Sequence, residues 1–274
     1  MTLNREIVFQ FFKYAVYALL TVNIFIFGRE EYFAAVLQFS DGLPVSDIIE
    51  AYAATIDTAA WVVLLLMFEL ETYVLDDRRF TPALTLTLHG IRIFCYAFIL
   101  YAFYGYIANL LFVYDVSPLA IGSKLCSLVS EQWAYAVDLD EYVALSVENC
   151  AKIGSNTALS QFGSLTIAVD RPGLIDIQRL AWTDVINAGV WILVVIILEI
   201  DVRLQERKRL DGLILKSSNA IKFVLYSILM LAAIYWGIKG DFVDFWDAFL
   251  WLLAFFFIEL NVIEWRQETA GETS

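Results

Sequence analysis

Residues 57–71 read DTAAWVVLLLMFELE, a long apolar run with a carboxylate near each end. The pattern is Asp57-x3-Trp61-x7-Glu69-x-Glu71, and it returns twice with unchanged spacing, as Asn187-x3-Trp191-x7-Glu199-x-Asp201 and as Asp247-x3-Trp251-x7-Glu259-x-Asn261. A carboxylate is costly in hydrocarbon. Three copies in register therefore indicate a structural unit that the chain uses three times.

The composition is typical of an integral membrane protein, with 60% hydrophobic and 16% aromatic residues among 274. A bilayer takes roughly 20 apolar residues to cross. The stretches that meet this length are 7–27, 48–75, 83–113, 180–202, 213–238 and 242–263. None contains a proline, so we expect six unbroken transmembrane helices in an all-α fold. The first stretch lacks a small-x-small cleavage site, and we expect it to be retained rather than removed as a signal peptide.

A second pattern pairs a basic residue with a tyrosine one helical turn later, on the same helix face. It occurs as Lys13-x3-Tyr17, Arg92-x3-Tyr96 and Lys222-x3-Tyr226. Each basic span precedes a Trp–Glu span, which predicts three tandem hairpins around a pseudo-threefold axis. Their ranges are 1–80, 81–210 and 211–274. The second hairpin consists of a span at 81–113, an insert at 114–179 and a span at 180–210.

The charged positions are expected to form layers. The inner layer, called the charged layer below, would contain Glu69, Glu199, Glu259, Lys13, Arg92 and Lys222. An outer polar layer would contain Asp57, Asn187 and Asp247. Glu69 and Glu71 lie about 200° apart on a helical wheel. We therefore expect the recurring Glu to face protein and the second polar position to lie near the headgroups.

Two roles remain open for the charged layer. Its opposite charges can neutralise one another and fix the packing of the helices, or they can form a route for protons or cations. The tryptophans Trp61, Trp191 and Trp251 are interpreted as interfacial anchors, with a ligand-stacking role as the alternative.

Lys and Arg gather in the short loops on one side of the spans, which predicts that both termini are cytoplasmic and that 114–179 is extracytoplasmic. We expect a bacterial inner membrane. The insert contains Cys126 and Cys150, for which a disulfide is expected and two unpaired thiols are the alternative. Alternation over 165–169 predicts a strand, and residues 32–39 suggest a short interfacial helix. The insert either docks a protein partner or is a plain surface loop.

Several functions are disfavoured. The chain has no readable catalytic triad, phosphate loop or dinucleotide fingerprint, so we expect neither an enzyme nor a cofactor. A lone His89 argues against a zinc site, and a net charge of −13 argues against nucleic acid.

Our functional prediction is a multi-pass membrane protein that conducts or transports a small cation or a proton. The alternatives are an accessory subunit of a larger membrane complex and a lipid-binding or lipid-modifying protein. The expected partners are the lipid bilayer, a protein at 114–179 and further copies of the chain.

Overall fold

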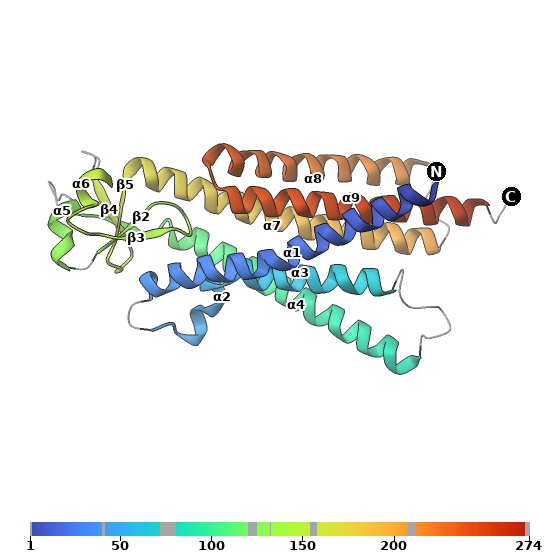
Figure 1. Ribbon diagram of the computed structural model, residues 1–274. Helices are drawn as coiled ribbons and strands as arrows, with labels where there is room; N and C mark the ends of the chain where they lie inside the picture. Colours follow the sequence, from blue (N-terminus) through green and yellow to red (C-terminus); the bar gives the residue numbers. More distant parts are fainter. Residues whose placement is uncertain are drawn as a thin grey trace. The chain divides into compact units, whose positions relative to one another are not determined.

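The computed structural model describes residues 2–39, 42–71, 81–119, 125–131, 133–153, 158–207 and 212–271, with side chains in these ranges except at 2–6, 206 and 260–271. Most of the chain is helical (Figure 1). The long helices are α1 (Thr2–Gln38), α3 (Ala53–Glu69), α4 (Pro82–Phe112), α7 (Arg171–Glu206), α8 (Gly212–Lys239) and α9 (Phe242–Gly271). They belong to two compact units, one of Met1–Asn23 with Asn187–Ser274 and one of Ile24–Ile186.

By length and composition, the described residues contain four helices that could cross a membrane: α1 from Ile7, α4, α7 and α8. A bent pair around Tyr52 brings the number to five if it counts as one span. The chain is therefore a helical membrane protein. At about 1.5 Å per residue, α1 and α7 are each longer than 50 Å, well beyond the roughly 30 Å of a hydrocarbon core. The helix α9 is not among the four because three acids, Asp244, Asp247 and Glu259, lie in the part of it whose side chains are described.

The expectation of an unbroken helix over 48–75 is wrong. A 3-10 turn η1 (Val45–Asp47) and a short helix α2 (Ile48–Ala51) precede α3, and the axis bends by 73° between them. At the break, Tyr52 leaves the helical conformation, with φ −133° and ψ 33°. The separate interfacial helix at 32–39 is also wrong, because α1 continues without interruption to Gln38.

The segment between α4 and α7 folds around a five-stranded sheet in the order β1-β4-β5-β2-β3. The strands are β1 (Val116–Pro118), β2 (Ala134–Ala136), β3 (Tyr142–Ala144), β4 (Leu159–Phe162) and β5 (Ile167–Asp170). Neighbouring strands are antiparallel except β2 and β5, which are parallel. The strand expected at 165–169 is thus present from Ile167 onward.

Short helices cover this sheet and carry the disulfide. They are α5 (Leu125–Leu128), η4 (Val129–Glu131) and α6 (Cys150–Ile153). The predicted Cys126–Cys150 bond is present and joins α5 to α6 across a sequence separation of 24. Beneath it, a small core includes Leu128, Trp133 and Leu159. The segment therefore has its own hydrophobic core, unlike a plain surface loop.

The sheet is attached directly to the ends of long helices. Strand β5 ends at Asp170, whose Oδ1 accepts the amide of Gly173 at 2.8 Å and so caps the N-terminus of α7. The Gln178 Nε2 atom donates to the carbonyl of Val113 at the end of α4, at 3.1 Å. These contacts fix the sheet to α4 and to the first turns of α7 within one unit.

Two helices of the same unit meet at Gly105. A Cβ atom placed there would lie 2.7 Å from the Ile49 carbonyl oxygen and 3.1 Å from the Ala53 Cβ. Glycine therefore allows α4 to approach the backbone of α2 beside the break.

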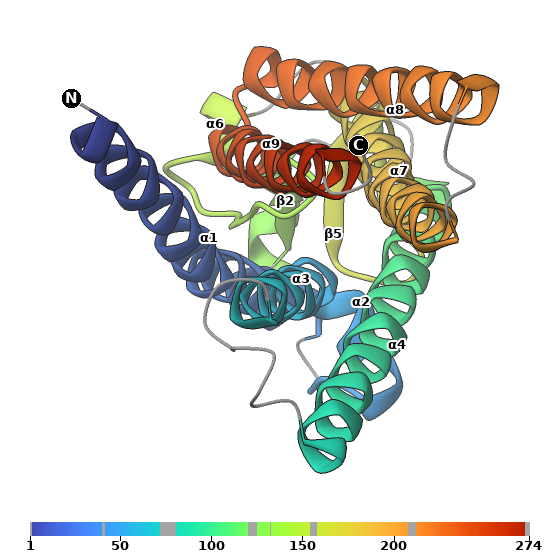
Figure 2. The same ribbon diagram turned by 90° about the vertical axis from the view of Figure 1, so that its right-hand side faces the viewer.

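In the other unit, α8 and α9 are neighbours joined by a tight turn in which Gly240 has φ 90° (Figure 2). Only Gly240 and Asp241 separate the two helices. The α8 side chains Ser218, Lys222, Leu225, Leu229 and Trp236 are buried at helical spacing. They define one continuous inward face on α8.

Candidate functional site

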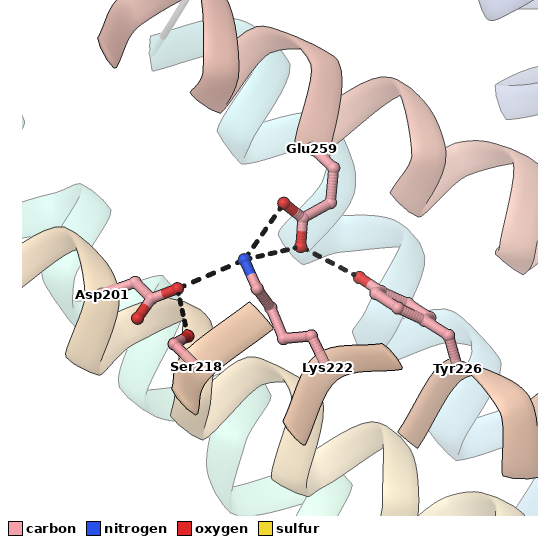
Figure 3. Close-up of polar contacts among 5 residues, drawn as sticks. All are labelled: Asp201, Ser218, Lys222, Tyr226 and Glu259. Atoms are coloured by element: carbon pink, nitrogen blue, oxygen red, sulfur yellow. Dashed lines mark hydrogen bonds and ion pairs between the residues drawn. The ribbon is translucent and has the colours of Figure 1, made fainter. Parts of the chain in front are cut away.

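The most connected group of charges surrounds Lys222 on α8 (Figure 3). Its Nζ atom lies 3.2 Å from Asp201 Oδ2 on α7, 3.2 Å from Glu259 Oε1 on α9 and 3.3 Å from Glu259 Oε2. The Lys222 and Asp201 side chains are 7% and 4% exposed, and that of Glu259 is 19% exposed. One ammonium therefore joins three helices.

Two hydroxyls complete this group. The Ser218 hydroxyl donates to Asp201 Oδ2 at 2.7 Å, and the Tyr226 hydroxyl donates to Glu259 Oε1 at 3.4 Å. Ser218, Lys222 and Tyr226 are four residues apart and share one face of α8. We call these five residues, Asp201, Ser218, Lys222, Tyr226 and Glu259, the Lys222 cluster. It explains the Lys-x3-Tyr spacing, because the two side chains reach the same carboxylate.

The structure reverses the two acids that were expected on α7. The Asp201 side chain is buried, whereas that of Glu199 is 42% exposed and pairs with Arg203 one turn along the same helix, at 3.7 Å. The prediction that the recurring Glu faces protein is therefore wrong for α7. The helical wheel correctly separated the two acids by more than half a turn, but it could not say which of them faces inward.

In the first two copies of the repeat, the residue at the second polar position forms an ion pair. These residues are Glu71 and Asp201. Arg92 on α4 pairs with Glu71 at 2.7 Å, where the chain makes a π-helical turn after α3. A π turn holds more residues than an α turn, so it shifts Glu71 away from the position of an ideal α-helix. Glu69 is buried at 5% exposure. Lys13 is 3% exposed, with Nζ 5.1 Å from the Tyr14 ring centroid.

The outer polar positions have different partners. The Asn23 Nδ2 atom donates to Asp247 Oδ1 at 2.7 Å, and Asn23 is only 1% exposed. Trp251 also hydrogen-bonds to Asp247. The Tyr106 hydroxyl donates to Asp57 Oδ2 at 3.5 Å, at the limit of a hydrogen bond. The Asn187 Oδ1 atom is buried and accepts no hydrogen bond from the described residues.

The three repeated tryptophans pack inside the protein. Trp61, Trp191 and Trp251 are all 9% exposed or less. Trp191 packs against Phe255 on α9 with ring centroids 4.6 Å apart. Exposed aromatic residues occur elsewhere, as where the Trp182 indole donates to the Tyr114 hydroxyl at 3.2 Å.

One buried carboxylate was missed as a site because it stands in a charged run at 29–31. Glu31 on α1 is 8% exposed and accepts the amides of Ala54 and Thr55 at 2.8 and 3.1 Å, together with the Thr55 hydroxyl. These amides belong to the first turn of α3, which has no capping side chain of its own. Glu31 therefore stabilises the break at Tyr52 by capping α3 from another helix. No local pattern around Tyr52 signals this.

Other missed residues had weak sequence signals. Asn23 and Ser218 are single polar residues in apolar stretches, and only their three-dimensional partners reveal their importance. In the sheet segment, burial raises the pKa of the Tyr135 phenol to about 12, assisted by the charge of Asp170 and a hydrogen bond to it. Burial also raises the pKa of Tyr142, with further contributions from Asp140, Glu50 and Asp138.

The described residues offer no candidate metal site. Among the described residues, no group of three His, Cys, Asp or Glu side chains is placed to hold a metal ion. His89 is exposed and its Nδ1 lies 2.8 Å from the Thr85 carbonyl oxygen. Comparisons with protein-family models, curated proteins and solved structures found no match.

Proposed function

We propose that this membrane protein moves protons or a small cation across the bilayer and that the Lys222 cluster is part of the route. The observation that supports this is the charge of the cluster. Two carboxylates, Asp201 and Glu259, face one ammonium, so the fully ionised group has one negative charge in excess. Such a group can take up one proton or attract one cation without breaking all of its ion pairs. Buried ionisable residues within a membrane are functional candidates for this reason.

The different partners of the repeated bases also favour transport. Arg92 pairs with Glu71, whereas Lys222 contacts acids on two other helices. An element used solely for packing would be expected to repeat its contacts with its sequence. We infer that the third copy has acquired a separate role.

The proposal includes a topology of six spans in three hairpins, with the sheet segment outside. On α7, the exposed Trp182 and the exposed Arg203 lie about 32 Å apart along the helix, close to the roughly 30 Å of a hydrocarbon core. Aromatic and basic residues typically mark the two edges of a membrane. The first turns of α7 would then extend beyond the bilayer to the sheet. The segment's acidic side chains would concentrate cations there.

Proton flux into proteoliposomes containing a pH-sensitive dye tests this function. We expect uptake driven by a membrane potential in the wild type and its loss in Glu259→Gln and Asp201→Asn. Glu199→Gln is the matched control, because this exposed acid pairs with Arg203 outside the cluster. Tyr226→Phe removes a single long hydrogen bond and is a milder variant if the others fail to fold. Wild-type flux of protons, Na⁺ and K⁺ that equals that of empty liposomes would overturn the proposal. Unchanged flux in every cluster variant would do the same.

A second function, an accessory subunit of a larger membrane complex, is favoured by the hydrogen bonding of the same cluster. The Lys222 ammonium contacts three carboxylate oxygen atoms, and each carboxylate also accepts a hydroxyl. Groups paired in this way suit a permanent connection between helices. On this reading the sheet segment docks a partner. Co-purification of a protein at fixed stoichiometry, lost when 114–179 is replaced, would support it. Ion flux through a chain that has no bound partner would contradict it.

A further inference from the structure

We propose that Asp247 on α9 binds a proton in the resting protein and that Asn23 on α1 holds the carboxyl group in place. The inference rests on the proposed function for its physiological meaning, because it identifies an outer proton-binding group on the route. Its chemistry can nevertheless be tested without any measurement of transport.

The geometry around Asp247 consists of neutral donors. The Asn23 amide donates to Oδ1 at 2.7 Å from a residue that is 1% exposed, and Trp251 hydrogen-bonds from one turn further along α9. Neither partner has a charge. This differs from Glu259 on the same helix, whose carboxylate meets the Lys222 ammonium at 3.2 Å.

Charged residues on the surrounding helices do not supply a countercharge. Among the described side chains of the unit that contains Asp247, they are Asp244 and Glu259 on α9, Lys216, Lys222 and Lys239 on α8, Lys13 on α1, and Glu199, Asp201 and Arg203 on α7. Lys222 is bound to Asp201 and Glu259, and Glu259 lies about 18 Å along α9 from Asp247. On α1, Lys13 lies about 15 Å and Arg29 about 9 Å along the axis from Asn23. Of these described groups, none forms an ion pair with the Asp247 carboxyl group, whose hydrogen-bond partners are Asn23 and Trp251.

An ionised carboxylate in this position would have two hydrogen bonds, from the buried side chains of Asn23 and Trp251, and no opposite charge beside it. Removing a carboxylate from water without a countercharge has a large free-energy penalty even after the surroundings relax. Binding a proton removes this penalty while Oδ1 still accepts the Asn23 amide. The proton comes from water and forms an O–H bond to the carboxyl group. It returns to water on release, and no other bond changes.

The two acids of α9 therefore have different roles. Glu259 is paired with the Lys222 ammonium, whereas Asp247 has only neutral hydrogen-bond partners and binds a proton of its own. A carboxyl group beside a base and one without a base differ in acidity. Two carboxyl groups can therefore have different acid–base roles in the same protein. The Asp-x3-Trp spacing of the third copy thus has a chemical reason, since the indole reaches the carboxyl group one turn before it.

The test uses the full chain in detergent and dicyclohexylcarbodiimide, an apolar reagent that modifies protonated carboxyl groups. We expect mass spectrometry to find the adduct on Asp247, more strongly in acidic than in alkaline buffer. Labelling should disappear in Asp247→Asn, which should remain folded because its amide resembles the neutral carboxyl group. Glu259→Gln should still be labelled at Asp247. In parallel, we expect an infrared band from a protonated carboxyl group that is absent in Asp247→Asn and shifts in Asn23→Val.

Absence of both the adduct and the infrared band at every pH would overturn the inference, and so would labelling of Glu259 in place of Asp247. The outcome of this test can be distinguished from the outcome of the flux measurement. A protonated Asp247 in a protein without flux would refute the proposed function alone. Flux with no proton on Asp247 would refute this inference alone.

Discussion

Ion pairs in this protein contribute differently to its stability because they differ in burial. Lys222 and Asp201 are nearly inaccessible and contact each other at 3.2 Å, whereas Arg203 and Glu199 are exposed and 3.7 Å apart. A buried pair is strongly destabilised when one partner is removed, because the other charge stays behind. An exposed pair is screened and contributes about 0–1 kcal/mol. The two pairs lie near the same end of α7 and form a natural comparison.

Lys222→Leu is expected to lower the free energy of unfolding by about 3–5 kcal/mol, because it leaves Asp201 and Glu259 buried without their base. Adding Asp201→Asn and Glu259→Gln should restore most of that loss. Thermal unfolding in detergent measures both. Arg203→Gln is the control and should change the stability by less than about 1 kcal/mol. Equal effects of Lys222→Leu and Arg203→Gln would show that the Lys222 cluster does not form.

The sheet segment should lose stability in alkali. The pKa of Tyr135 is raised to about 12, while an unfolded tyrosine ionises near pH 10. Between these values the folded state binds more protons than the unfolded state, so stability falls as pH rises. The total loss is about 3 kcal/mol. Near-ultraviolet circular dichroism against pH should show this loss, reduced in Tyr135→Phe and unchanged in exposed Tyr114→Phe. A flat profile for the wild type above pH 10 would contradict the burial of this phenol.

At the scale of helices, replacing a glycine on α4 should destabilise the protein at one position and not at another. The reason is that only one of the two glycines lies against the backbone of a neighbouring helix. Gly105→Ala places a Cβ 2.7 Å from the Ile49 carbonyl oxygen, which belongs to rigid backbone. We expect a loss of about 1–3 kcal/mol in thermal unfolding. Gly90→Ala on the same helix meets nothing within 4 Å and should stabilise the helix by up to about 1 kcal/mol. If both variants behave alike, α2 and α4 do not touch at Gly105.

The break before α3 is expected to depend on Glu31. Glu31→Ala leaves the Ala54 and Thr55 amides without their acceptor, which costs about 1–3 kcal/mol. Hydrogen exchange at these two amides should become faster, while exchange in the middle of α3 should change less. Thr55→Val removes the hydroxyl bond and keeps both amides capped, so its effect should be smaller. Unchanged exchange in Glu31→Ala would show that another group caps α3.

These elements also show where sequence analysis succeeded and where it could not. The long apolar stretches predicted the membrane helices, since length and hydropathy are local properties. The break at Tyr52 was missed because it has neither Gly nor Pro and depends on Glu31, more than twenty residues earlier. The inward acid of α7 was chosen wrongly because Glu199 and Asp201 are chemically alike. The surrounding helices, and not the wheel, decide which one is buried.

At the scale of the whole molecule, the sheet segment was also predictable from the sequence only in part. Its disulfide and one strand were predictable from two cysteines and a short alternating run. Its strand order places β5 between β2 and β4, and this arrangement depends on contacts distant in sequence. Six spans and a threefold repeat remain predictions, because the described residues contain four helices, or five with the bent pair, that could cross a membrane.

Cysteine labelling in intact cells tests that topology. If the sheet segment is outside, a membrane-impermeant maleimide added after reduction should label exposed Cys126 but not buried Cys95. Lys216 lies exposed in the first turns of α8 on the expected cytoplasmic side. In a variant lacking the native cysteines, Lys216→Cys should therefore react only after the membrane is opened. Labelling of Lys216→Cys in intact cells would reverse the orientation, because α8 joins the short outer turn at Gly240 to this position by a single helix.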